Sequence, residues 1–98
     1  MVRKAPPDDY VFETLMADLV GHDRAPSAFL VYLRLWHLCG GPGRRGAASL
    51  ATLAIETGLS KSSVQAALRR LKSRSLIEAM QASATAVPVY SVLAPWRR

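Results

Sequence analysis

The chain has 98 residues, of which 50% are apolar and 20% are charged, and its net charge is +6 at pH 7. This length gives one domain, because two would each be too small to bury a core unaided, and the composition excludes a wholly disordered chain. The most apolar run, residues 28–39, is too short to cross a bilayer and contains Arg34 and His37, so we expect no membrane partner. The basic charge predicts an anionic partner, with nucleic acid as the first hypothesis.

Few residues are available for metal, redox or hydrolytic chemistry. One cysteine, Cys39, cannot form an internal disulfide, and two histidines without companions do not make a zinc site. The first residues carry charge but no apolar h-region, so we expect no signal peptide and a reducing cytoplasm. His22, Asp23 and Ser27 have the residue types of a hydrolase triad but no nucleophile elbow. We therefore expect no metal, no cofactor and no enzymatic activity.

The charge is unevenly distributed along the chain. Residues 1–23 hold two basic and five acidic residues, a net charge of −3, whereas residues 24–98 hold eleven basic and two acidic residues, a net charge of +9. No acidic residue lies between Glu56 and Glu78. The positive field is therefore local and points to a binding surface, with a merely solvated helix face as the alternative.

Two helices are predicted in the first part of the chain. Residues 1–9 indicate a flexible arm, after which a helix begins near Tyr10 and ends at Gly21. Apolar residues at i, i+3, i+4 and i+7 are typical of one buried helix face, here Phe12, Leu15, Met16 and Leu19. A second helix, about 26–38, is apolar nearly all round and must be covered by the first helix, by the rest of the domain or by a second copy.

A glycine-rich segment, residues 40–46, follows as a flexible loop. It lacks the Lys-Ser/Thr ending of a phosphate-binding P-loop, which excludes that function. Arg44 and Arg45 are candidates for contact with a phosphate backbone, and a solvated turn is the alternative.

The strongest pattern lies at residues 49–74. Ser49 caps a short helix over 50–57, Gly58 supplies a left-handed turn, and Ser60 caps a second helix that begins at Lys61 and ends near residue 73 or 74. Small and apolar residues on the inner faces let the two helices approach closely, namely Leu50, Leu53, Ala54, Val64, Ala67, Leu68 and Leu71. The order of short helix, glycine turn and second helix predicts a helix-turn-helix.

Residues 50–69 closely resemble the helix-turn-helix signature of DNA-binding proteins. Two strand-like segments follow within 76–93, separated by small residues that suit a hairpin loop. Residues 26–94 thus resemble the winged helix-turn-helix family, including MarR/GntR-type regulators and small winged domains of replication initiators. The resemblance implies a mainly α fold with a small antiparallel β wing over residues 10–94, a brief third strand at Ala47-Ala48, and a basic tail at 95–98.

The resemblance also implies which residues contact DNA. The second helix of the pair would enter the major groove, where Gln can bond to adenine and Arg or Lys to guanine. The tip of the wing, residues 82–86, has no charge, so the helix would do most of the reading. The predicted DNA-binding residues are Ser60, Lys61, Ser62, Ser63, Gln65, Arg69 and Lys72, with Arg44 and Arg45 in support; Arg70 and Arg74 would serve phosphate or solvent.

The sequence therefore predicts sequence-specific binding of double-stranded DNA by a cytoplasmic, nucleoid-associated homodimer that acts as a small transcriptional regulator. Two alternatives stay open, a replication or partition accessory of a phage or plasmid and a winged-helix adaptor that binds proteins. An adaptor does not need the acid-free basic stretch 57–77, which favours DNA.

Overall fold

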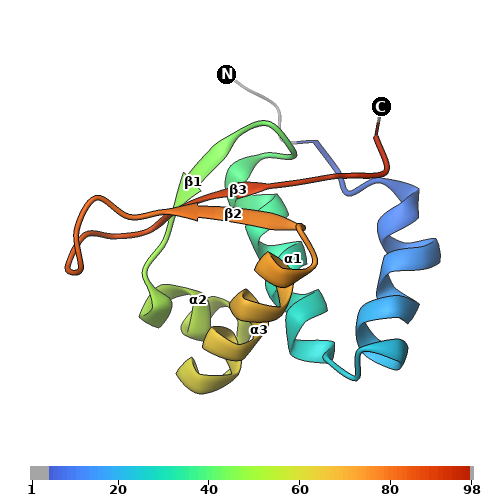
Figure 1. Cartoon of the computed structure of the whole chain (residues 1–98), viewed down its shortest axis with the longest axis horizontal. Helices are drawn as coiled ribbons and strands as arrows, with labels where there is room; N and C mark the ends of the chain where they lie inside the picture. The colour runs from blue at the N-terminus through green and yellow to red at the C-terminus, as the bar shows by residue number, and fades with distance from the viewer. Residues whose placement is uncertain (1–4, 98) are drawn as a thin grey trace.

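Helices make up most of the chain, and a small antiparallel sheet lies beside them (Figure 1). The computed structural model describes residues 5–97. Its elements are η1 (Val11–Leu15), η2 (Asp18–His22), α1 (Pro26–Cys39), β1 (Arg45–Ala47), α2 (Leu50–Thr57), α3 (Lys61–Ser73), β2 (Ile77–Met80) and β3 (Val89–Val92). The predicted helix-rich fold with a small antiparallel sheet is confirmed.

The N-terminal helix differs from its prediction. Residues 9–22 form one helix in which η1 and η2 have the wider π winding, and Val11, Leu15 and Leu19 are its buried residues. Phe12 and Met16, predicted to be buried, are 47% and 41% exposed. In a π-helix each amide bonds to the carbonyl five residues earlier, so each turn holds more residues than a turn of an α-helix. Residues spaced by four therefore stay on one face, which explains why Val11, Leu15 and Leu19 are buried and Phe12 and Met16 are not.

The end of this helix also differs from the prediction. Gly21 does not end it; the helix continues to His22, and the chain turns at Arg24, whose φ is 52°. The Ala25 amide donates to the Leu19 carbonyl at 2.8 Å and closes the turn.

The apolar helix α1 is the centre of the domain. It contacts η2, α2, α3, β1 and β3, and these neighbours cover most of its surface. Tyr32 and Trp36 are fully buried, and the polar atom of each side chain donates a hydrogen bond to a backbone carbonyl. The Tyr32 hydroxyl donates to Leu93 O at 2.8 Å, and Trp36 Nε1 donates to Ala5 O at 3.0 Å. The domain itself therefore supplies the cover that this helix requires.

The pair α2 and α3 has the predicted local structure. Ser49 Oγ accepts a hydrogen bond from the Thr52 amide at 3.0 Å, and Ser60 Oγ accepts one from the Ser63 amide at 3.1 Å. Gly58 turns the chain with φ of 77°, a conformation that side chains disfavour. The predicted inner residues of α3, namely Val64, Ala67, Leu68 and Leu71, are all buried.

The sheet has the order β1-β3-β2, with both pairs antiparallel. Tyr90 and Val92 of β3 face the core, whereas Val89 is on the outer face. Strand β1 begins two residues before the predicted third strand, so Arg45 lies in the sheet and not in a flexible loop. Ala48 follows the strand, and its amide donates to Pro88 O at 3.2 Å.

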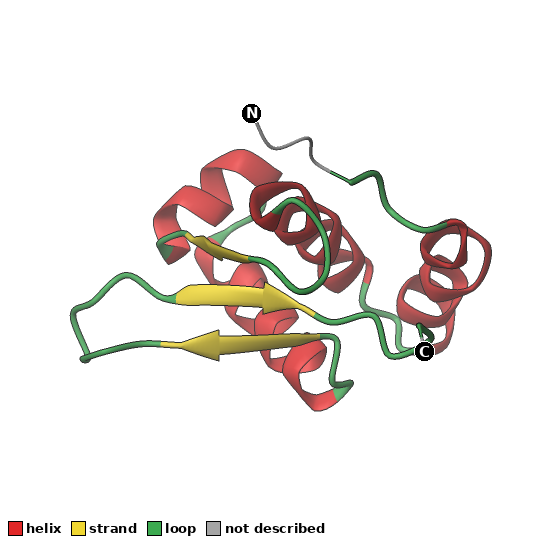
Figure 2. Ribbon diagram, turned by 90° about the horizontal axis from the view of Figure 1, so that it is seen from above, coloured by secondary structure: helices red, strands yellow, loops and turns green. Residues whose placement is uncertain are grey.

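The segment after β3 packs on the N-terminal helix. Trp96 Nε1 and Arg97 Nε both donate to Asp8 Oδ2 at 2.8 Å, and the Tyr10 and Trp96 rings stack with centroids 4.5 Å apart. Figure 2 shows the C-terminal end of the chain beside the N-terminal helix and opposite the β2–β3 loop. The remaining basic residues of the predicted arm and tail, Arg3, Lys4 and Arg98, lie outside the described residues.

Candidate nucleic-acid interface

One face of α3 carries a row of polar and basic side chains. Lys61, Gln65 and Arg69 are spaced by four residues and are exposed, and Lys72 continues the row one turn later. Within residues 5–97 none of these three basic side chains forms an ion pair. Helix α3 contains no acidic residue, so this face presents an uncompensated positive field to solvent.

The start of α3 is a cluster of hydroxyls. The Ser60 hydroxyl lies 2.9 Å from that of Ser63 and 3.2 Å from that of Ser62. Ser60 and Ser63 are therefore engaged in capping the helix, while Ser62 and Lys61 are exposed beside them. The amide groups of this first turn carry the positive end of the helix dipole, which favours an anion.

A groove of about 630 Å³ lies between α3 and the β2–β3 loop. Gln65, Arg69 and Lys72 form one wall, and Ser49 and Leu50 lie at the start of α2 beside them. The opposite wall is the hairpin loop, with Gln81, Ala84, Thr85, Ala86, Val87 and Pro88. The groove therefore combines a basic helix face with a neutral wall.

Gln81 orders that neutral wall, a role that the sequence did not reveal. Its Nε2 donates to Ala86 O at 2.7 Å and to Ala84 O at 3.3 Å, which bridges the two sides of the loop. The sequence shows only that Gln81 is an amide side chain between a strand-like segment and the run of small residues at 82–86. Only the folded loop shows which carbonyl groups come within reach.

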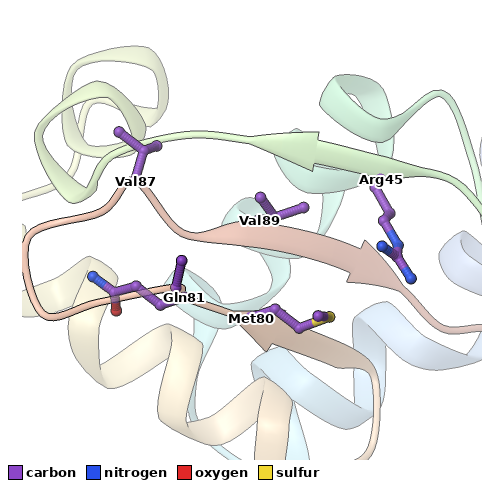
Figure 3. A pocket seen from close by; sticks show the side chains of 6 residues that line it. Arg45, Met80, Gln81, Val87 and Val89 are labelled. Carbon is purple, nitrogen blue, oxygen red and sulfur yellow. The ribbon is translucent and has the colours of Figure 1, made fainter.

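The structure separates Arg45 from the α3 residues. In β1, Arg45 pairs in register with Ser91 and projects from the outer face of the sheet. There it borders a hollow of about 490 Å³ with Met80, Val87 and Val89 (Figure 3). Arg44 is exposed in the turn before this strand. The predicted site is thus one group on α3 and a second, basic position on another surface.

Arg74 has a different role from the one predicted. Its guanidinium lies 3.2 Å from Asp23 Oδ1 and 3.7 Å from Asp18 Oδ2, so it braces α3 against the N-terminal helix. A hydrogen bond from His22 and the charge of Arg74 hold the pKa of Asp23 below its usual range. The sequence did not predict these ion pairs, because the acidic residues that fold onto Arg74 belong to a distant segment.

Other reactive groups are in the core or scattered. Cys39 is buried, its Sγ lies 3.4 Å from Tyr90 O, and burial raises the pKa of its thiol. In the described part of the chain no three His, Cys, Asp or Glu side chains are grouped as metal ligands. No helix among residues 5–97 has the length and apolar character needed to cross a membrane.

Comparison of the chain with protein-family models, with curated proteins and with solved structures found no match. The groove and the exposed face of α3 are therefore the features from which a function can be inferred.

Proposed function

We propose that the chain binds double-stranded DNA in a sequence-specific manner, as a winged helix-turn-helix protein and a small transcriptional regulator. The observation that carries the proposal is the exposed, acid-free face of α3 beside a groove closed by the β2–β3 loop. A basic helix preceded by a short helix and a glycine turn is the arrangement that inserts into the major groove. In this proposal the β2–β3 hairpin is the wing.

The chemistry of the α3 face fits base reading in its centre and phosphate binding at its ends. A helix with its side chains is about 10–12 Å in diameter, which fits a major groove about 12 Å wide, and the 13 residues of α3 give it a length of about 20 Å. Gln65 can bond bidentately to adenine and Arg69 to guanine. Lys61, the first-turn amides and Lys72 would hold phosphates on either side. The uncharged wing would follow the backbone without adding charge-based affinity.

An adaptor function is the second candidate, and one observation favours it. Met80 and Val87, at the mouth of the outer hollow of the sheet, are 60% and 54% exposed (Figure 3). Exposed apolar side chains grouped around a hollow are typical of surfaces that bind proteins. Met80 borders the outer hollow only, whereas Val87 also lines the groove beside α3, so substitution of Met80 separates the two functions.

The test compares Arg69→Ala with Arg70→Ala, two changes that each remove one arginine from the same helix. Arg69 lines the groove, whereas Arg70 lines a different hollow beside Asp23 and Ala25. After selection of a preferred site from random duplexes, affinity is measured for that site and for a scrambled duplex over a salt series. Arg69→Ala should cost about 1–3 kcal/mol on the preferred site only, and Gln65→Ala should behave alike.

Arg70→Ala should leave the sequence preference unchanged. Equal weakening of both duplexes by Arg69→Ala would show that this face does not read bases. Absence of binding to any duplex at low salt would remove the DNA proposal and leave the adaptor candidate.

A further inference from the structure

The N-terminal helix leaves an apolar stripe uncovered. Phe12, Met16 and Val20 are 47%, 41% and 40% exposed, and their four-residue spacing places them in one row. Phe12 also meets the buried Phe29 edge-on, with ring centroids 6.4 Å apart, so its position is fixed by the core. The helix thus presents an ordered apolar surface and not a set of isolated side chains.

The residues beside the stripe are small or charged. Ala17 and Gly21 are exposed, and a Cβ added to Gly21 would meet no atom within 4 Å, so a second helix has room to approach closely. Acidic residues, Asp9 and Glu13, lie at the start of the helix, and Arg24 lies just past its end. Within residues 5–97 none of these three has an ion-pair partner.

We infer that this stripe is the contact surface for a second copy of the chain, with the two N-terminal helices packed antiparallel around a two-fold axis near Met16. An isologous contact places the same surface on both partners. Antiparallel helices centred there set Phe12 beside the partner copy's Val20 and bring each Arg24 to the other copy's Asp9. The two-fold symmetry therefore creates two ion pairs between Arg24 of one copy and Asp9 of the other. Asp18 does not take part, because it already forms an ion pair with Arg74 at 3.7 Å.

The dimensions of the domain agree with a dimeric DNA reader, a part of the inference that rests on the proposed function. The molecule spans 36 Å along its longest axis, with the N-terminal helix at one end, the β2–β3 loop at the other and α3 near the middle (Figure 1). A two-fold axis at the helix end separates the two α3 helices by roughly one molecular length. Successive major grooves on one side of DNA are about 34–36 Å apart.

The first experiment measures the oligomeric state of the full chain by sedimentation at tens of micromolar. The wild type should sediment as a dimer, at twice the 10.7 kDa of one chain. Met16→Glu places two carboxylates at the axis and should raise the dimer dissociation constant at least about 100-fold. Ile55→Glu is the matched control, because Ile55 is an exposed apolar residue of α2 and is 82% exposed away from the stripe. Its dissociation constant should equal that of the wild type.

A charge exchange keeps the inference testable if Met16→Glu fails to fold. Arg24→Glu should raise the dissociation constant about tenfold, and the double variant Asp9→Arg with Arg24→Glu should restore it. A monomeric wild type would overturn the inference, and so would a double variant no tighter than the single variant or a weakened Ile55→Glu control.

Binding to duplexes separates this inference from the proposed function. Two selected half-sites one helical turn apart should bind the wild type cooperatively, and Arg24→Glu should keep single half-site affinity while it loses cooperativity. A wild type that binds half-sites but stays monomeric refutes the dimer and leaves the DNA function. A dimer that binds no duplex refutes the DNA function and leaves the contact surface.

Discussion

Substitution of Arg74 by alanine separates structural charge from binding charge on α3. The guanidinium joins the end of this helix to the N-terminal helix through Asp23, at 3.2 Å, and Asp18, at 3.7 Å. The Asp23 side chain is only 5% exposed, and its Oδ2 is buried without a hydrogen-bond partner among the described residues. Removal of Arg74 leaves this carboxylate with the hydrogen bond from His22 and the longer-range attraction of Arg70.

The expected loss of stability follows from this burial. Loss of one partner from a fully buried ion pair costs about 3–5 kcal/mol, because the remaining charge is uncompensated. The Arg74 side chain is 33% exposed, so water replaces part of the interaction, and we expect about 2 kcal/mol. For a domain of this size each kcal/mol lowers the melting temperature by about 4–8 °C, which gives a decrease of roughly 8–16 °C.

Thermal unfolding of three variants tests this reasoning. Arg69→Ala is the control, because Arg69 is exposed and forms no ion pair within the described residues; its free energy of unfolding should change by no more than about 0.5 kcal/mol. Asp23→Asn added to Arg74→Ala should recover part of the loss, because it removes the unpaired charge. An Arg74→Ala protein as stable as the wild type, with a shallower salt dependence of DNA binding, would refute the structural role and restore the phosphate-contact hypothesis.

Two further changes test the acidic contacts and the loop. The hydrogen bond from Arg97 is the main cause that lowers the pKa of Asp8, and the hydrogen bond from His22 is the main cause that lowers the pKa of Asp23. The two carboxylates therefore stabilise the fold at a pH above their unfolded-state pKa of about 4. This stabilisation is lost as the pH falls through their lower folded-state pKa values. As the pH falls from about 6 to about 2, the melting temperature should decrease less steeply for Asp8→Asn than for the wild type. Gln81→Ala removes both bonds that bridge the β2–β3 loop, so amide hydrogen exchange should become faster in residues 82–86 but not in α3.

The helix pair was predictable from the sequence because its determinants are local. Ser49 and Ser60 cap the helices that directly follow them, and Gly58 turns the chain where it stands. Each of these residues acts on backbone groups within about four positions of itself, so both partners of each interaction can be recognised from the local sequence. The exposed row on α3 follows from the same periodicity once its inner face is known.

The N-terminal helix and the chain end were harder to predict because their contacts are remote. Trp96 reaches Asp8 across 88 positions, and Arg74 reaches Asp23 across 51. The N-terminal helix has two adjacent apolar rows, and the sequence pattern is compatible with burial of either one. Packing against α1 determines that the row of Val11, Leu15 and Leu19 is the buried one. No local rule contains that choice.

The ion pairs change the meaning of the net charge of +6. Arg34 pairs with Glu56, Arg74 with Asp18 and Asp23, and Arg97 with Asp8, so three arginines and four carboxylates neutralise one another within the domain. The basic residues of α3 are left without such partners among residues 5–97, while the acidic residues left over include Asp9 and Glu13 on the N-terminal helix. Folding therefore sharpens the charge difference between the two surfaces. A field concentrated on one helix steers an anionic polymer to that helix, which a uniformly basic protein of the same net charge cannot do.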